Sequence, residues 1–224
     1  MKVKVSYLAH SFFKISAEKN LLVDPFFEHP SQERLIKCPV TENSLKNIDV
    51  ILITHEHPDH FDKAAIERIA NREKCLVVAT RNVLNELNLH QAQCIEVSSY
   101  DEKLLRGFKI TALPAHHPTA FYPVSYLIKV GNKTIFHAGD TTLKDEFAEI
   151  KADLCLLPIA GKATMDVVDA VKATKMIKPK YAVPMHYGTF EHIKVDPREF
   201  SYRIDKSILK TKPVILKPGK SITI

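Results

Sequence analysis

The segment THEHPDH, at residues 54–60, constrains the fold of this chain more than any other feature. Its candidate metal ligands are His55, His57, Asp59 and His60, which lie between the apolar run IDVILIT and a segment with helical periodicity. Imidazole and carboxylate groups are the usual ligands of divalent zinc, manganese and iron, and a turn lets alternate side chains converge. A loop that is rich in histidine by chance is the alternative, but crowded imidazoles would repel one another if charged. We therefore expect a metal-binding turn at the end of a buried strand.

The length and composition are those of an ordinary globular protein. The chain has 224 residues, 45% of them hydrophobic and 26% charged, which argues against a disordered or membrane-embedded protein. No apolar run approaches the ~20 residues that span a bilayer, and MKVKVSYLAHSFF reaches His10 before a signal-peptide core develops. There is no linker, repeat or low-complexity segment, so we expect one domain over residues 1–224 and a cytoplasmic location.

The charge and the cysteines give weaker indications. A net charge of +6 is compatible with an anionic small-molecule substrate, but the lysines form no basic block, so nucleic-acid binding is not predicted. The oligomeric state stays open, and a homo-oligomer is compatible with the sequence. The four cysteines form no pair of metal-site spacing and are expected to be reduced structural thiols: Cys38, Cys75, Cys94 and Cys155.

The apolar pattern divides the chain into two β-rich halves that each carry helices. The first half has strand patterns at 3–8, 12–16, 20–27, 48–54 and 75–80, and a helix after Asp62. The second half has strand patterns at 108–114, 125–130, 133–138, 153–160, 181–185 and 213–217, and helices over 165–177 and after Asp196. Two such halves predict an α/β fold in which two sheets pack face to face with helices outside.

Three further candidate ligands follow apolar strands elsewhere in the chain. They are His117 after FKITALPAH, Asp140 after KTIFHAG and His186 after YAVPM. Side chains from separate strand ends can meet at one edge of packed sheets, where α/β architectures place their sites. We therefore expect a single site that collects all seven candidate ligands.

The order of these residues resembles the metallo-β-lactamase-fold superfamily. The motifs that match are T-H-x-H-x-D-H, a later histidine, H-x-G-D-T and a closing P-M-H. Along essentially the whole chain, LAHSFFKI, LLVDPFF, PAHHP, FHAGDT, TMD and PMHYGTF are similar to the small metal-dependent hydrolase branch near the ascorbate-phosphate lactonase-like proteins. The resemblance implies a four-layer αββα sandwich of two mixed β-sheets with helices outside, and two metal ions at one edge.

The resemblance also implies how two divalent ions, expected to be zinc with manganese or iron as alternatives, would share the ligands. His55, His57 and His117 would bind the first ion, Asp59, His60 and His186 the second, and Asp140 would bridge them. PAHHP also offers His116 as the third ligand. The branch has P-A-x-H here, which favours His117, and neighbouring strand residues face opposite ways.

Two other residues, Asp24 and His10, are expected in the catalytic site together with Asp59. Asp24 matches an early strand-end aspartate of the superfamily that would orient the metal-binding loop, although an aspartate that caps the turn before Pro25 is the alternative. His10 matches a Gly-His position of the branch. Ala9 replaces that glycine, which leaves open the close backbone approach and the role of His10.

The expected chemistry is hydrolysis by a metal-bound hydroxide. Two divalent cations would lower the pKa of a bound water toward ~7, and Asp59 would orient the nucleophile and move its proton. No G-H-T-x-G stretch surrounds the third ligand, so we expect a small anionic ester, lactone or phosphodiester rather than a thiolester or β-lactam. The alternatives are a di-iron redox protein, which needs an electron source, and a non-catalytic metal-stabilised binding module.

Overall fold

The computed structural model describes residues 1–224 and contains two seven-stranded β-sheets. In sheet order, the first comprises β14 (Ser221–Thr223), β1 (Lys4–Tyr7), β2 (Phe13–Ser16), β3 (Asn20–Val23), β4 (Val50–Leu52), β5 (Leu76–Ala79) and β6 (Cys94–Glu96). The second comprises β13 (Lys212–Pro213), β12 (Tyr181–Met185), β11 (Leu154–Pro158), β10 (Lys133–His137), β9 (Val124–Val130), β8 (Phe108–Pro114) and β7 (Glu102–Leu105). Both sheets are mixed, because β3 to β6 and β10 to β13 pair in parallel and the other neighbours are antiparallel.

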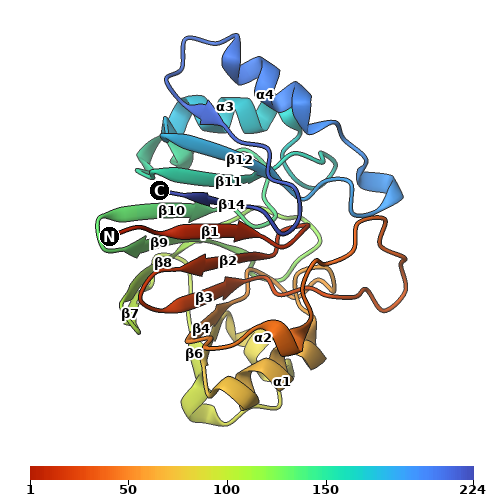
Figure 1. Cartoon of the computed structure of the whole chain (residues 1–224), viewed down its shortest axis with the longest axis vertical. Coiled ribbons are helices and arrows are strands. Elements are labelled where there is room, and N and C mark those ends of the chain that lie inside the picture. The colour runs from red at the N-terminus through yellow and green to blue at the C-terminus, as the bar shows by residue number, and fades with distance from the viewer.

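Helices cover the two outer faces of the packed sheets (Figure 1). They are α1 (Lys63–Glu73), α2 (Arg81–Glu86), α3 (Val167–Ile177) and α4 (Pro197–Asp205), with short 3-10 turns η1 (Glu42–Ser44), η2 (Gln91–Gln93), η3 (Asp145–Glu149) and η4 (Glu191–Ile193). Ile51 of β4 packs with Ile66 and Ile69 of α1, whereas its neighbours Val50 and Leu52 belong to the core between the sheets. This alternation confirms the predicted α/β sandwich, in which β3, β4 and β5 of the first sheet contribute to two apolar layers.

The strongest local signals explain the elements that lie nearest the site. All three residues of β4 and all five of β11 are buried, as continuous apolar runs in parallel sheets should be. Asp62 caps α1 by accepting a hydrogen bond from the Ala65 amide, and Asp166 caps α3 in the same way from Asp169. The hairpin over Gly131-Asn132 joins β9 to β10 as predicted.

The end of the chain differs from the prediction. The predicted strand over 213–217 is wrong, because β13 ends at Pro213 and the last strand is β14, which pairs antiparallel with β1. Between them, a turn at Pro218-Gly219, in which the Lys220 amide donates to the Lys217 carbonyl at 2.9 Å, redirects the chain to the other sheet. The strand predicted over 20–27 ends at Val23, because Asp24 adopts a φ of 47°.

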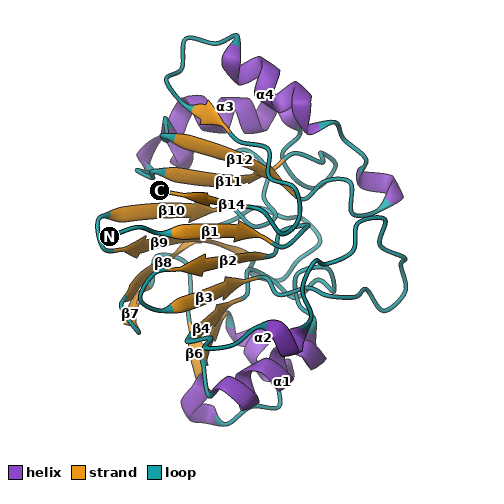
Figure 2. Cartoon of the chain, viewed as in Figure 1, coloured by secondary structure: helices purple, strands orange, loops and turns teal.

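Both sheets place the ends of their parallel strands at one edge, on the side opposite the two chain termini (Figure 2). The long loops collect at this edge. The Tyr126 hydroxyl of β9 donates to the Ile53 carbonyl at 2.9 Å, which ties the second sheet to the start of the His-rich turn. All four cysteines are free thiols, and none of the helices is long and apolar enough to cross a membrane.

Candidate metal centre

The candidate ligands converge at this edge from both sheets. The His-rich turn follows β4, His117 follows β8, Asp140 follows β10 and His186 follows β12. Three groups of side chains have potential ligand atoms within 4.8 Å of one another: His55, His57 and His117; His10, Asp59, His60 and His186; and His55, His60 and Asp140. The structure therefore brings together all seven candidate ligands, and it places His10, which the sequence also expected at the site, in the second group.

Three imidazoles form the first group. His57 Nδ1 lies 3.1 Å from His55 Nε2 and 3.1 Å from His117 Nε2. The ligand nitrogens of a tetrahedral zinc ion, each about 2.0–2.1 Å from the metal, lie roughly 3.3 Å apart. The spacing of the three nitrogens therefore fits a metal ion, provided that none of them carries a proton.

The outer nitrogens of His57 and His117 show which tautomers these rings adopt. His57 Nε2 lies 3.0 Å from the Thr119 carbonyl oxygen, and His117 Nδ1 lies 3.0 Å from the Ala163 carbonyl oxygen. A carbonyl oxygen can only accept a hydrogen bond, so both outer nitrogens carry the proton. The inner nitrogens, His57 Nδ1 and His117 Nε2, then present lone pairs.

The tautomer of His55 follows from the hydrogen bonds of the neighbouring Thr54 hydroxyl. The Thr54 hydroxyl donates its only proton to Asp24 Oδ2 at 2.8 Å, so it accepts from His55 Nδ1 at 3.0 Å. His55 Nε2 therefore presents a lone pair as well. Burial lowers the pKa of both His55 and His117, which favours their neutral forms. Three inward-facing nitrogens with lone pairs fit a cation between them.

Carboxylates and imidazoles form the second group. Asp140 joins it to the first: Oδ1 lies 3.3 Å from His60 Nε2, while Oδ2 lies 3.0 Å from His186 Nε2 and 3.7 Å from His117 Nε2. His186 Nε2 also lies 3.6 Å from Asp59 Oδ2. The buried atoms His60 Nε2, His186 Nε2 and Asp140 Oδ1 have no partner of hydrogen-bond geometry. This donor set fits a second cation, with Asp140 between the two positions.

Charge in the second group is balanced by protons when no metal is bound. Burial opposes ionisation of Asp140, but the neighbouring His186 and His60 outweigh it and hold the pKa of Asp140 well below its ordinary value. Conversely, Asp140 overcomes the effect of burial and raises the pKa of His186 to about 9 and that of His60 well above its usual range. A metal ion would replace these protons, so metal binding should release them and weaken at low pH.

Asp24 supports the His-rich turn from below. It is fully buried, and it accepts hydrogen bonds from the Thr54 amide and the Thr54 hydroxyl, both at 2.8 Å. His60 Nδ1 lies 2.8 Å from Asp24 Oδ2, which places the proton on that nitrogen and turns Nε2 toward Asp140. Asp24 therefore orients the turn and one of its imidazoles, beyond capping a turn before Pro25.

Replacing Asp24 with asparagine should weaken both folding and metal binding. The new NH2 group would face one of the three donors that Asp24 now accepts from, and that hydrogen bond would be lost. We therefore expect a loss of about 2 kcal/mol in the free energy of unfolding. Affinity for a metal ion at the group that contains His60 should fall about 10- to 100-fold, since His60 loses its orientation. Urea unfolding of metal-free protein and competition with a zinc chelator measure the two effects. Asp49→Asn, whose side chain accepts from the Asn20 amide away from the site, should leave metal affinity unchanged.

His10 lies against the second group in an uncommon backbone conformation. It is fully buried, with a φ of 61°, and Ala9 has a φ of 85°. Its carbonyl accepts a hydrogen bond from the His186 amide at 3.0 Å, so the close backbone approach is made despite Ala9. Burial, followed by the nearby His186, lowers the pKa of His10 to about 3. The neutral ring then donates from Nε2 to Asp59 Oδ2 at 3.1 Å.

Comparison with known proteins places this arrangement in a family. Residues 4–186 match the model of the Beta-lactamase superfamily domain. The chain belongs to the metallo-β-lactamase superfamily. It is 33% identical to a UPF0173 metal-dependent hydrolase of Methanosarcina barkeri, with 99% of each chain covered, and 37% identical to one of Staphylothermus marinus, with 98% of each covered.

A solved structure agrees with these relatives. Igni18, a metallo hydrolase from the hyperthermophilic archaeon Ignicoccus hospitalis, superimposes with a TM-score of 0.86 at 30% identity, covering 100% of this chain and 99% of the other. The comparisons confirm the resemblance found in the sequence and the metallo-β-lactamase fold. By this membership the protein is an enzyme of the metal-dependent hydrolase class.

Within the superfamily fold, several groups contribute that the sequence did not single out. They are the Thr54 hydroxyl and the carbonyls of Thr119 and Ala163, which fix the imidazole tautomers. His137 is fully buried and bridges the carbonyl of Ser11 and the amide of Gly139 at 2.9 and 3.1 Å, so it braces the loop before Asp140. Thr54 and His137 each had a usable signal, because both belong to the motifs T-H-x-H-x-D-H and H-x-G-D-T that the sequence analysis quotes. The two carbonyls had none, because their positions depend on loop conformation.

The structure separates the two adjacent histidines after β8. His117 is buried within the first imidazole group, whereas His116 is exposed and its Nδ1 lies 2.9 Å from the Thr142 hydroxyl. The His116 amide donates to the Thr141 hydroxyl at 3.0 Å. His116 therefore lies outside all three groups of candidate ligands.

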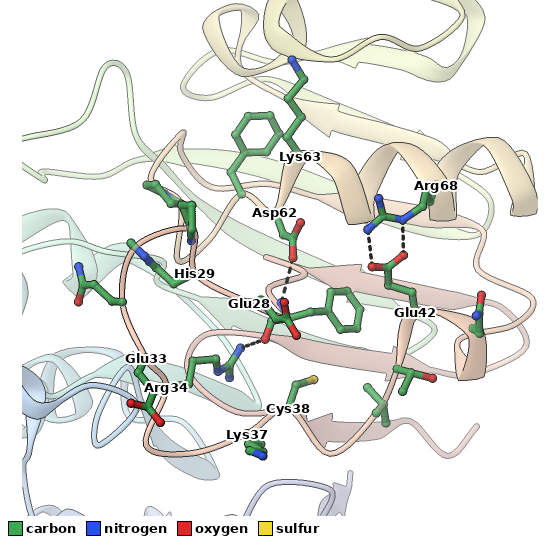
Figure 3. A pocket seen from close by; sticks show the side chains of 18 of the residues that line it. Glu28, His29, Glu33, Arg34, Lys37, Cys38, Glu42, Asp62, Lys63 and Arg68 are labelled. Carbon is green, nitrogen blue, oxygen red and sulfur yellow. Dashed lines mark hydrogen bonds and ion pairs between the residues drawn. The ribbon is translucent and has the colours of Figure 1, made fainter.

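A cavity of about 1140 Å³ lies beside the His-rich turn (Figure 3). The loop that carries Glu28, Arg34 and Lys37 forms one side, and the start of α1, with Lys63 and Arg68, forms the other. Glu56 and Pro58 of the turn also line it, but none of the seven candidate ligands does. Half of the residues that line it are charged, and only four are hydrophobic.

Proposed function

We propose that this enzyme hydrolyses a small anionic ester, lactone or phosphodiester, with two divalent metal ions, expected to be zinc, at the seven convergent ligands. The single observation that carries the proposal is the convergence of His55, His57 and His117, in which His57 Nδ1 lies 3.1 Å from the Nε2 atoms of both other rings, beside buried polar atoms that lack hydrogen-bond partners. A non-catalytic binding module is not favoured, because the enzymes that this chain resembles are named as hydrolases.

The bound ions would supply a low pKa for water and polarise the carbonyl or phosphoryl oxygen of the substrate. The protein's own groups do the rest. Asp59 lies at the edge of the cluster, and 22% of its side-chain surface is exposed, so one carboxylate oxygen can face both the ligands and an entering water. We assign Asp59 to orient that water and to hold its proton during attack.

His10 acts through Asp59 in this proposal. Its neutral ring donates to Asp59 Oδ2, which fixes the rotation of that carboxylate and leaves the other oxygen free. His10 itself is fully buried, between Phe26, Phe190 and His186, and has no access to a substrate. It is therefore a positioning residue, as is Asp24 through Thr54 and His60.

A panel of three substrates tests the proposed activity. Protein purified without chelator and loaded with zinc should hydrolyse at least one of bis(p-nitrophenyl) phosphate, γ-butyrolactone and p-nitrophenyl acetate. Removal of the metal should lower the rate by about 100-fold or more, and added zinc or manganese should restore it. Failure of the loaded protein on all three, or turnover that resists chelation, would contradict the proposal.

A further inference from the structure

The loop of residues 117–123 carries two exposed aromatic side chains beside the metal centre. Phe121 is 71% exposed and Tyr122 is 79% exposed. Large aromatic side chains are usually buried at least in part, because each removes a large apolar area from water. Two consecutive exposed aromatic residues in a loop that follows a candidate ligand indicate a surface that contacts a ligand.

This aromatic loop is attached directly to the first imidazole group. The Thr119 carbonyl accepts from His57 Nε2 at 3.0 Å, and the Thr119 hydroxyl lies 3.4 Å from His117 Nε2. The Ala120 amide donates to the His117 carbonyl at 3.1 Å, which makes the start of the loop a tight turn. Phe121 is thus two residues from atoms that contact two candidate ligands, so a molecule bound at the metal centre would adjoin the aromatic pair.

A pair of polar side chains holds the tip of the loop in place. Glu56 Oε1 accepts from the Phe121 amide at 2.7 Å, and Asn82 Nδ2 donates both to the Phe121 carbonyl and to Glu56 Oε2 at 3.1 Å. Glu56 lies between His55 and His57 in the chain, so the same turn that presents the ligands also anchors the loop. The backbone that carries Phe121 is therefore held in place before any ligand binds, which lowers the entropic cost of binding.

We propose that Phe121 and Tyr122 bind an apolar, preferably aromatic, substituent of the substrate, while Glu56 and Asn82 position the loop that carries them. The inference rests on the proposed function and narrows its substrate class to an anion with an attached apolar group. Only four of the residues that line the neighbouring cavity are hydrophobic, and Phe121 and Tyr122 are not among its lining residues (Figure 3). The aromatic loop offers the apolar group of the substrate a surface to pack against.

Two phosphonates test the inference by binding alone, without turnover. Isothermal titration of zinc-loaded protein should give a dissociation constant for phenylphosphonate about tenfold or more below that for methylphosphonate. In the double variant Phe121→Ala/Tyr122→Ala the ratio should fall to about two or less, while methylphosphonate binds as before. The matched control is Tyr100→Ala/Tyr202→Ala, which removes two exposed aromatic rings elsewhere and should keep the ratio.

The positioning role of Glu56 and Asn82 is tested at Asn82, because Asn82 is not adjacent in sequence to any candidate ligand. Asn82→Ala should lower the phenyl-to-methyl ratio severalfold and leave both the zinc content and the methylphosphonate affinity unchanged, which a merely folding role would not do. An unchanged ratio in the Phe121→Ala/Tyr122→Ala protein would overturn this inference alone. If zinc-loaded wild-type protein bound neither phosphonate, both this inference and the proposed function would be overturned.

Discussion

Asp59→Asn is expected to lower the hydrolysis rate by about 10²- to 10⁴-fold while the protein keeps most of its metal. Asparagine has nearly the same shape and retains one oxygen that can face the second metal position. It carries no charge, however, and cannot hold the proton of an attacking water. Its amide group would also oppose the proton that His10 Nε2 now donates to Asp59 Oδ2 at 3.1 Å. Activity should therefore fall much further than metal content.

The matched control for this variant lies three residues away. Asp62 accepts hydrogen bonds from the Ala65 and Phe27 amides, outside all groups of candidate ligands. Asparagine is also a good helix cap, so Asp62→Asn should stay within a fewfold of wild-type activity. Turnover and metal content measured on the same preparations separate the two effects. Near-wild-type turnover by Asp59→Asn would remove Asp59 from the mechanism.

His117→Ala is expected to remove about one metal equivalent per chain and nearly all activity. This imidazole supplies one of three lone pairs that face one another, and its Nδ1 proton is fixed by the Ala163 carbonyl at 3.0 Å. No other side chain nearby can replace the lost nitrogen, since the exposed His116 ring lies beside the Thr142 hydroxyl.

The adjacent histidine supplies the control for this prediction. His116→Ala should keep both metals and change mainly the Michaelis constant or the rate, because His116 is exposed at the rim of the site. Metal analysis and steady-state kinetics on the two variants distinguish the positions. Loss of a metal equivalent from His116→Ala, with full loading of His117→Ala, would assign the ligand to His116.

Most of the candidate ligands could be predicted because they come directly after clear apolar strand patterns in the sequence. Apolar runs of strand length precede His55, His117, Asp140 and His186, and each run predicts a strand. The ends of strands in packed sheets meet at one edge, which brings these residues together. The His-rich turn itself is a local pattern. The β-sandwich and the sheet edge that carries the site thus follow from the hydrophobic periodicity, and the candidate ligands follow from the chemistry of metal binding.

What could not be predicted depends on tertiary contacts that leave no local pattern. Asp24, His10 and His186 all have positive φ values, of 47°, 61° and 55°, a conformation that no aspartate or histidine signals by its type. The short strands β6, β7 and β14 have at most four residues each, and they form because a neighbouring strand offers unpaired backbone groups. The anchoring of Phe121 by Glu56 and Asn82 likewise joins three distant segments.

The number of metal ions per chain tests the central claim most directly. Elemental analysis by mass spectrometry should be made on protein purified without chelator and reconstituted with excess zinc, after gel filtration. We predict about two ions per chain, since seven convergent ligands exceed the four that a tetrahedral zinc ion uses. A value of one or none after reconstitution would contradict the dinuclear centre.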